Sequence, residues 1–138
     1  MKSRHKIFLL LALLCLLAGL INYILFQPNI FLLLIYKHKI TAISISNLAI
    51  KHILSGYFSD AMWCIALCFV VLTLSELNYL RTSEKIGILL LPFITETSQF
   101  FGFIRGTFDW YDIFLYLIII LAFTMFSSIF NTHTYEKD

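Results

Sequence analysis

Polar residues gather in the last third of an otherwise apolar chain. The set consists of acids, one arginine and one amide: Glu96, Gln99, Arg105, Asp109 and Asp112. Carboxylates at hydrocarbon depth are costly, so chains that retain them use them for pairing, for handling ions or protons, or for contacting a ligand. This set is therefore the leading candidate for a functional site.

Helical spacing puts these side chains on two stripes. Glu96 and Gln99 are three residues apart and share one helix face. Asp109, Asp112 and Tyr116 follow the same rule at spacings of three and four. The two segments are consecutive and joined by a short link, so we expect an antiparallel hairpin whose stripes face each other. The carboxylates cannot all stay charged at that depth without the arginine, a metal ion or protons to neutralise them.

Structural roles explain part of the same pattern. Asp109 and Asp112 can compensate the N-terminal dipole of the last helix, while Arg105 extends to water. For Asp109, capping and a functional role are weighted equally. For Glu96, which lies inside an apolar helix beside Pro92, we favour a role in a site.

Composition indicates the class of protein that carries these residues. The 138 residues are 60% hydrophobic and only 13% charged, with a mean hydropathy of +0.88, whereas soluble domains are about a quarter charged. The apolar residues come in blocks close to the length of a bilayer crossing. We predict one all-α integral membrane domain over residues 1–138, with four transmembrane helices at about 7–26, 60–77, 86–103 and 112–130.

Local signals add detail to these spans. The block at 7–26 is expected to be a retained span, because its apolar core is longer than that of a cleaved signal peptide. Ser59 is expected to cap the second helix, with Asp60 at its positive end. Pro92 removes a backbone hydrogen bond and is expected to bend the third helix. A short interfacial helix is expected at 47–54, between the first and second spans.

Charge counting sets the expected orientation. With the N-terminus inside, six Lys and Arg flank the spans on the cytoplasmic side and four on the other, which favours both termini in the cytoplasm. The polar set then lies on the outer face, where Trp110, Tyr111, Tyr57 and Trp63 suit the membrane interface. A net charge of +2 gives no reason to expect nucleic acid as a partner.

The polar set resembles the corresponding part of the VanZ-like family, small membrane proteins named for a teicoplanin-resistance protein. The resemblance rests on the pattern Glu96-x2-Gln99-x5-Arg105-x3-Asp109-x2-Asp112, on Asp60-Ala-Met-Trp63, and on the number and order of apolar blocks. It implies a protein of the bacterial inner (cytoplasmic) membrane, linked in some members to glycopeptide tolerance, and no reaction. Tyr116 stands where many members have an asparagine.

Three functions stay open. The leading hypothesis is a non-enzymatic protein that binds a lipid headgroup or small molecule: Arg105 contacts an anionic group, the acids hold a cation or amine, and Gln99 fixes orientation. The alternative is an intramembrane enzyme acting on a lipid-linked envelope precursor, with a divalent cation at Glu96, Asp109 and Asp112. A second alternative is an ion or proton translocator using Glu96. Catalytic residues are not assigned, no other cofactor is expected, and the expected partners are membrane lipids, a lipid-linked or glycopeptide ligand, or further copies of the chain.

Overall fold

The computed structural model describes residues 4–26, 50, 53–104 and 106–135. Within these ranges every regular element is a helix and no strand occurs, so the all-α prediction is confirmed there. The elements in chain order are α1 (Arg4–Phe26), a π-helical turn η1 (Ile53–Tyr57), α4 (Phe58–Glu76), α5 (Thr82–Leu89), α6 (Leu91–Phe100) and α7 (Trp110–Tyr135).

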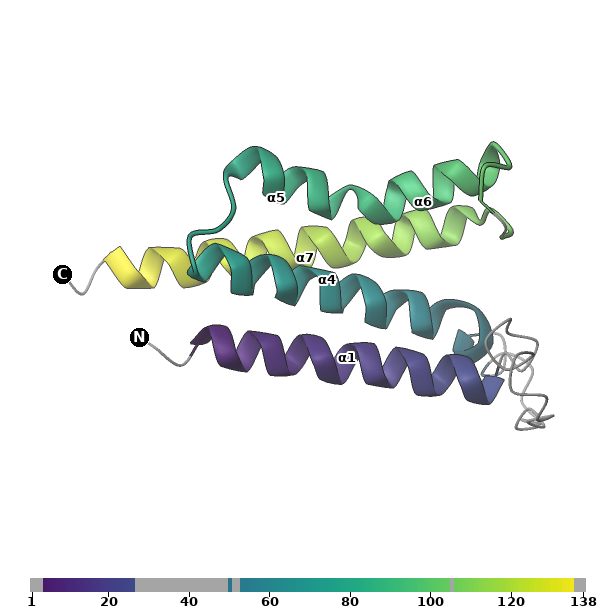
Figure 1. Ribbon diagram of the computed structural model, residues 1–138, viewed down its shortest axis with the longest axis horizontal. Helices are drawn as coiled ribbons and strands as arrows, with labels where there is room; N and C mark the ends of the chain where they lie inside the picture. Colours follow the sequence, from purple (N-terminus) through teal and green to yellow (C-terminus); the bar gives the residue numbers. More distant parts are fainter. Residues whose placement is uncertain (1–3, 27–49, 51–52, 105, 136–138) are drawn as a thin grey trace.

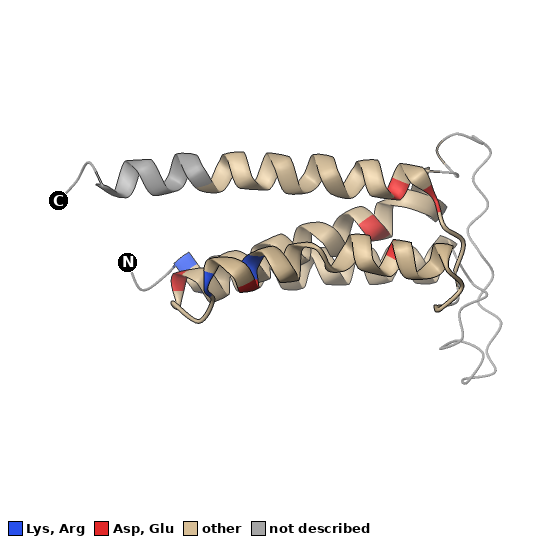
Figure 2. Ribbon diagram, turned by 90° about the horizontal axis from the view of Figure 1, so that it is seen from above, with Lys and Arg blue, Asp and Glu red and all other residues tan. Residues whose placement is uncertain are grey.

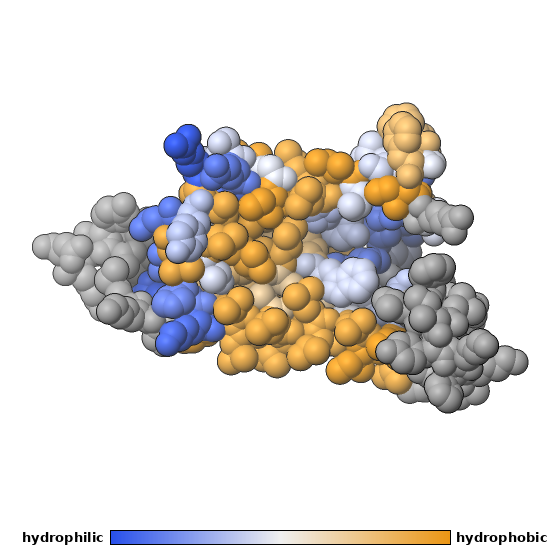
Figure 3. Space-filling model, in the orientation of Figure 1, coloured by the Kyte–Doolittle hydropathy of each residue, from blue (hydrophilic) through white to orange (hydrophobic). Residues whose placement is uncertain are grey.

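Three helices are long and apolar enough to cross a membrane: α1, α4 and the Trp110–Ser127 part of α7. They match three of the predicted spans to within a few residues. Large apolar side chains are exposed along α1 and α7, and Figure 3 shows an apolar band over the middle of the bundle with hydrophilic residues toward its ends. Such a surface is suited to hydrocarbon, and the chain is a helical membrane protein.

The predicted third span, 86–103, differs from the structure. It is replaced by two short helices, α5 and α6, which follow one another along a bent path, with α5 against α4 and α6 against α7 (Figure 1). Leu90 separates them, its N–H donating to the Ile86 carbonyl at 3.0 Å, and Pro92 lies in the first turn of α6. The bend arises there because proline lacks the N–H that would bond the carbonyl of Ile88. Helix α5 begins at Thr82, before the predicted start at 86, and α6 ends at Phe100, before the predicted end at 103.

Helix α4 connects the two halves of the bundle. It packs against α1 on one side and α7 on another, and α6 also packs against α7 (Figure 1). Rings of Phe8 and Phe69 join α1 to α4 with centroids 6.3 Å apart, and those of Tyr23 and Trp63 do so at 5.7 Å. Small residues fill much of the core and permit close helix approach: Ala12, Cys64, Ala66 and Cys68.

The bundle has two distinct ends. The first turn of α1, the α4–α5 turn and the last turn of α7 lie at one end, which we call the terminal end (Figure 1). The turn η1 and the α6–α7 connection lie at the other, which we call the loop end. The predicted interfacial helix at 47–54 falls mainly outside the described residues.

A set of hydrogen bonds near the loop end joins α1 to α4. The Asn22 Nδ2 atom donates to the Leu54 carbonyl at 2.6 Å and to the Ser59 hydroxyl at 3.0 Å. The Ser59 hydroxyl in turn donates to the Gly19 carbonyl at 3.1 Å. We call Gly19, Asn22, Leu54 and Ser59 the α1–α4 clasp.

The expectation that Ser59 caps α4 is therefore wrong. Tyr57 occupies the cap position without a side-chain capping bond. Helix α4 begins at Phe58, so Ser59 lies inside its first turn, past the cap position, and its hydroxyl bonds the neighbouring helix α1 instead. A Cβ added at Gly19 would lie 2.6 Å from Trp63 Nε1, so the glycine allows this close contact between α1 and α4.

Candidate functional site

Glu96 is the deepest of the predicted site residues. It lies on α6 with 5% of its surface exposed, whereas the neighbouring residues Thr95 and Thr97 are exposed. Its carboxylate accepts a hydrogen bond from the backbone N–H of Asp109. Its Oε2 atom, however, is buried with no hydrogen-bond partner. The Glu96 side chain is therefore directed into the protein and not toward its surface.

The two aspartates at the start of α7 have different surroundings. Asp109 precedes the helix, and its Oδ1 accepts the Tyr111 N–H at 2.9 Å, as a capping residue does. Its Oδ2 accepts the Tyr57 hydroxyl at 3.1 Å. Asp112 is 8% exposed, and its Oδ1 atom is buried without a partner. Capping thus accounts for Asp109 and leaves the buried state of Asp112 unexplained.

Tyr116 lies where three helices meet. It is 6% exposed, and its ring packs edge-on against Phe93 of α6 with centroids 6.1 Å apart. It interacts electrostatically with Glu96 and Asp112 and also with Asp60 on α4. Asp112 and Tyr116 thus share one buried face of α7, whereas Asp109, the third member of the predicted stripe, precedes the helix.

Gln99 contacts the α6–α7 connection. A Cβ added at Gly106 would overlap the Gln99 side-chain amide, so this glycine leaves room for it. Helix α6 ends at Phe100. Gly102, whose φ of 74° is left-handed, follows it, and the Phe103 N–H donates to the Ser98 carbonyl at 2.9 Å. These turns bring the chain back so that α7 begins beside α6. Arg105 lies outside the described residues.

Asp60 belongs with these acids, although its position in the first turn of α4 led us to treat it as a helix-dipole residue. It interacts electrostatically with Glu96 and with Asp112. One sequence signal pointed to it: no other Asp, Glu, Lys or Arg occurs between Lys51 and Glu76. We call Asp60, Glu96, Asp109 and Asp112 the acidic cluster. Tyr57, which bonds Asp109, is a second member of the site that sequence reasoning did not place there.

Charge is unevenly distributed over the described residues. The Lys and Arg residues among them all lie toward the terminal end: Arg4, Lys6, Arg81 and Lys85. The acidic cluster lies toward the loop end. In Figure 2 the described Lys and Arg residues are at the terminal end only, whereas acidic residues occur toward both ends. Within the described part of the chain, the carboxylates of the cluster therefore repel one another when they are ionised.

A metal ion is one way to neutralise such a set. No three His, Cys, Asp or Glu side chains among the described residues are grouped so that they could hold a metal ion. Glu96, Asp109 and Asp112, the residues named for a divalent cation, do not form such a group in this arrangement. The chemistry that the site offers is instead that of buried carboxylate acceptors beside tyrosine hydroxyls.

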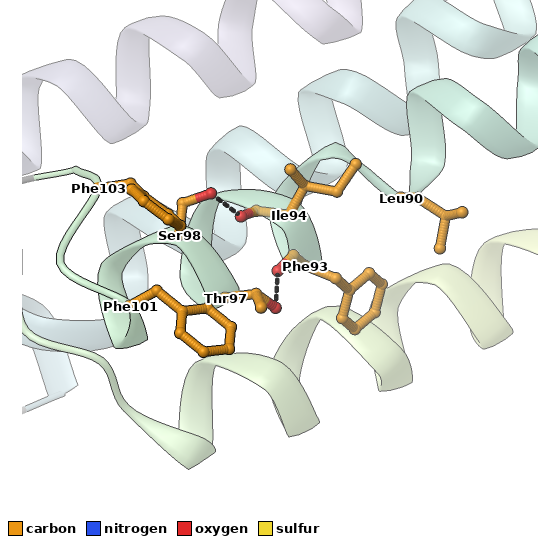
Figure 4. Close-up of a pocket in the computed structure, with 7 residues that line it drawn as sticks. All are labelled: Leu90, Phe93, Ile94, Thr97, Ser98, Phe101 and Phe103. Carbon is orange, nitrogen blue, oxygen red and sulfur yellow. Dashed lines mark hydrogen bonds between the residues drawn. The ribbon is translucent and has the colours of Figure 1, made fainter.

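An apolar depression of about 350 Å³ lies along α6, and Glu96 is not among the residues that line it (Figure 4). Its hydroxyl groups are bonded within the helix: Thr97 donates to the Phe93 carbonyl and Ser98 to the Ile94 carbonyl, each at 2.7 Å. Both hydroxyl donors are thus used within the helix, and we regard the depression as lipid-facing surface.

Aromatic side chains crowd the loop end. Phe108 contacts Phe100 at 5.1 Å and Trp110 at 5.0 Å between ring centroids. Trp110 and Tyr111 are 64% and 70% exposed, as expected of residues at a membrane interface. Trp63 is 39% exposed on α4, and its ring also contacts Tyr23 of α1. Comparison of the chain with family models, with curated proteins and with solved structures finds no match.

Proposed function

We propose that the chain crosses the membrane four times, with α5 and α6 together forming the third crossing. Residues 82–100 extend about 28 Å as helix, close to the thickness of the hydrocarbon. An even number of crossings agrees with α1 starting and α7 ending at the same end of the bundle. The interfacial helix at 47–54 would lie between the first two crossings.

In the proposed orientation the protein lies in a bacterial inner membrane with its terminal end on the cytoplasmic side. Arg4, Lys6, Arg81 and Lys85 support it, because cytoplasmic flanks are enriched in Lys and Arg. The acidic cluster then faces the outer leaflet. Trp110 and Tyr111 would lie at the outer interface.

The function we propose is non-enzymatic: a VanZ-like protein that binds a lipid headgroup or small molecule through the acidic cluster. One observation carries this proposal. Glu96 Oε2 and Asp112 Oδ1 are buried acceptors with no partner, and a buried acceptor of this kind is costly unless something bonds it. A bound ligand that donates to both atoms would remove that cost. The resemblance links such a protein to glycopeptide tolerance or to the cell envelope.

The residue roles follow from their positions. Glu96 and Asp112 would contact the ligand, Asp60 would add negative charge from α4, and Asp109 would hold the start of α7 in place through its bond to Tyr111. Arg105 would contact the anionic part of the ligand, a role that rests on the sequence pattern alone.

Proton translocation receives less support from the packing. A proton path needs polar groups across the bundle. Beyond the acidic cluster and the clasp, Thr73 is the buried polar residue of the described core, and its hydroxyl donates to the Phe69 carbonyl at 2.9 Å. The acidic cluster thus lies at one end without a described polar chain leading to the other.

Native mass spectrometry of the detergent-purified protein tests the proposal. The parent chain is expected to retain a bound molecule that the Glu96→Gln/Asp112→Asn double variant loses. A matched control, Glu76→Gln/Glu84→Gln, neutralises two acids at the terminal end and is expected to retain it. Equal retention by all three proteins would contradict the proposal, and a mass change on adding a chelator would favour the metal-dependent alternative.

A further inference from the structure

The two unpartnered carboxylate oxygens define what a ligand must supply. Glu96 is 95% buried and Asp112 is 92% buried, by their exposed fractions of 5% and 8%. Each has one oxygen with no hydrogen-bond partner, and they belong to neighbouring helices, α6 and α7. Both atoms are acceptors when the groups are ionised. A ligand group that bonds both atoms must therefore donate at least two hydrogen bonds, and a positive charge on it suits two ionised acids.

Charge and geometry narrow the class of cation. Grouped metal-ligating side chains are not found among the described residues. An organic ammonium needs fewer and less regular contacts, since a primary ammonium has three N–H donors that reach separate acceptors. A quaternary ammonium has no N–H and would leave both oxygens unbonded. Asp60 and the ring of Tyr116, which lie close by, add negative charge and an aromatic surface.

The site lies at a depth that a headgroup amine reaches. Glu96 is four residues before the end of α6, about 6 Å along the helix, and Asp112 is two residues into α7, about 3 Å along it. Trp110 and Tyr111 are exposed at the same end, where aromatic residues mark headgroup level. The acceptors are thus within about one helical turn of the interface.

We infer, resting on the proposed function, that the group bound between Glu96 and Asp112 is a primary ammonium. It comes from the headgroup of an aminophospholipid such as phosphatidylethanolamine or from a soluble primary amine. These sources share the same N–H donors, and they differ in whether an acyl chain is attached. The anionic part of the ligand and any further contacts lie outside this inference.

Competition among lipids of defined headgroup tests the inference on the unmodified chain. The delipidated protein is mixed with equal amounts of phosphatidylethanolamine, its mono-, di- and trimethylated forms, and phosphatidylglycerol, and the bound lipids are counted by native mass spectrometry. Retention is expected to fall with each methyl group added, and to be at least tenfold lower for the trimethylated form than for phosphatidylethanolamine. This series needs no variant, so misfolding cannot produce its result.

Two isosteric variants then locate the site. Glu96→Gln and Asp112→Asn are each expected to reduce the preference for phosphatidylethanolamine at least fivefold, whereas Glu76→Gln at the terminal end leaves it unchanged. Circular dichroism and size-exclusion elution establish that the variants are folded. A parallel arm adds free ethanolamine: thermal stabilisation by ethanolamine that depends on Glu96, without lipid preference, identifies a soluble amine as the source.

The outcomes separate this inference from the proposed function. The ammonium inference is overturned if phosphatidylglycerol is retained in a way that depends on Glu96 and Asp112, or if all members of the methylated series are retained equally. Either result leaves the proposed ligand site in place. If no lipid or amine binds in a way that depends on Glu96 and Asp112, both this inference and the proposed function are overturned.

Discussion

The α1–α4 clasp and the acidic cluster are two buried polar regions near the same end of the bundle, and they differ in how their hydrogen bonds are used. In the clasp, the Asn22 amide and the Ser59 hydroxyl both donate to acceptors across the interface. In the acidic cluster, Glu96 and Asp112 each keep one buried oxygen unbonded. The donors of the clasp are thus all bonded within the protein, whereas the acidic cluster has two buried acceptors that the protein leaves unbonded.

Consecutive residues of α4 belong to different regions. Ser59 faces α1, where it bonds the Gly19 carbonyl, and Asp60 interacts with the acids of α6 and α7. Successive residues on a helix point about 100° apart, so one turn of α4 serves both interfaces. The clasp thus holds the helix that presents Asp60. A side chain of the clasp and one of the acidic cluster are thus neighbours in the sequence, and substitutions should separate their effects.

The largest effect is expected at the glycine of the clasp. Gly19→Ala adds a Cβ against the Trp63 ring, and such overpacking is expected to lower the free energy of unfolding by about 2 kcal/mol. Gly87→Ala is the matched control, because nothing lies within 4 Å of a Cβ there. Denaturation in mixed micelles measures both. Equal stability of the two variants would show that α1 and α4 are not held this closely.

Loss of the Asn22 amide comes next. Asn22→Leu removes two interhelical hydrogen bonds and is expected to destabilise the protein by about 1 to 1.5 kcal/mol, since such bonds contribute about 0.6 kcal/mol each and leave unbonded groups when lost. The same denaturation assay checks it. An increase in stability would mean that the clasp is not the satisfied network described above.

Neutralising Glu96 should raise the free energy of unfolding, in contrast to the substitutions in the clasp. Without ligand at neutral pH, Glu96→Gln is expected to stabilise the protein by about 1 kcal/mol, because a neutral amide of the same shape removes a like charge from the cluster. Glu76→Gln, at an exposed position, is expected to change stability by less than about 0.5 kcal/mol. A destabilised Glu96→Gln variant would place Glu96 with the clasp as a structural residue.

The smallest effect concerns the rim of the cluster. A double-mutant cycle of Tyr57→Phe and Asp109→Asn isolates the 3.1 Å hydrogen bond between these side chains. A coupling of about 0.5 to 1 kcal/mol is expected for one bond to a charged acceptor near the interface. A coupling near zero would mean that the bond does not restrain η1 against α7.

Much of the fold could be predicted from local pattern. The blocks at 7–26, 60–77 and 112–130 correspond to α1, α4 and α7, because an apolar segment in hydrocarbon must bond its own backbone groups as helix. Pro92 marks the bend for a stereochemical reason that acts within one turn. The spacing of Glu96, Asp109 and Asp112 likewise predicted that a hairpin would bring them together.

The sequence by itself determined the helices, the bend and the acids of the α6–α7 hairpin, because these depend on residues a few positions apart. Only the tertiary structure decided that Asp60 joins these acids and that Ser59 bonds α1 instead of capping α4. Helix α4 is apolar on nearly every side, so periodicity does not indicate which face meets which neighbour. That choice depends on the packing of α4 against α1 and α7, between segments far apart in the chain.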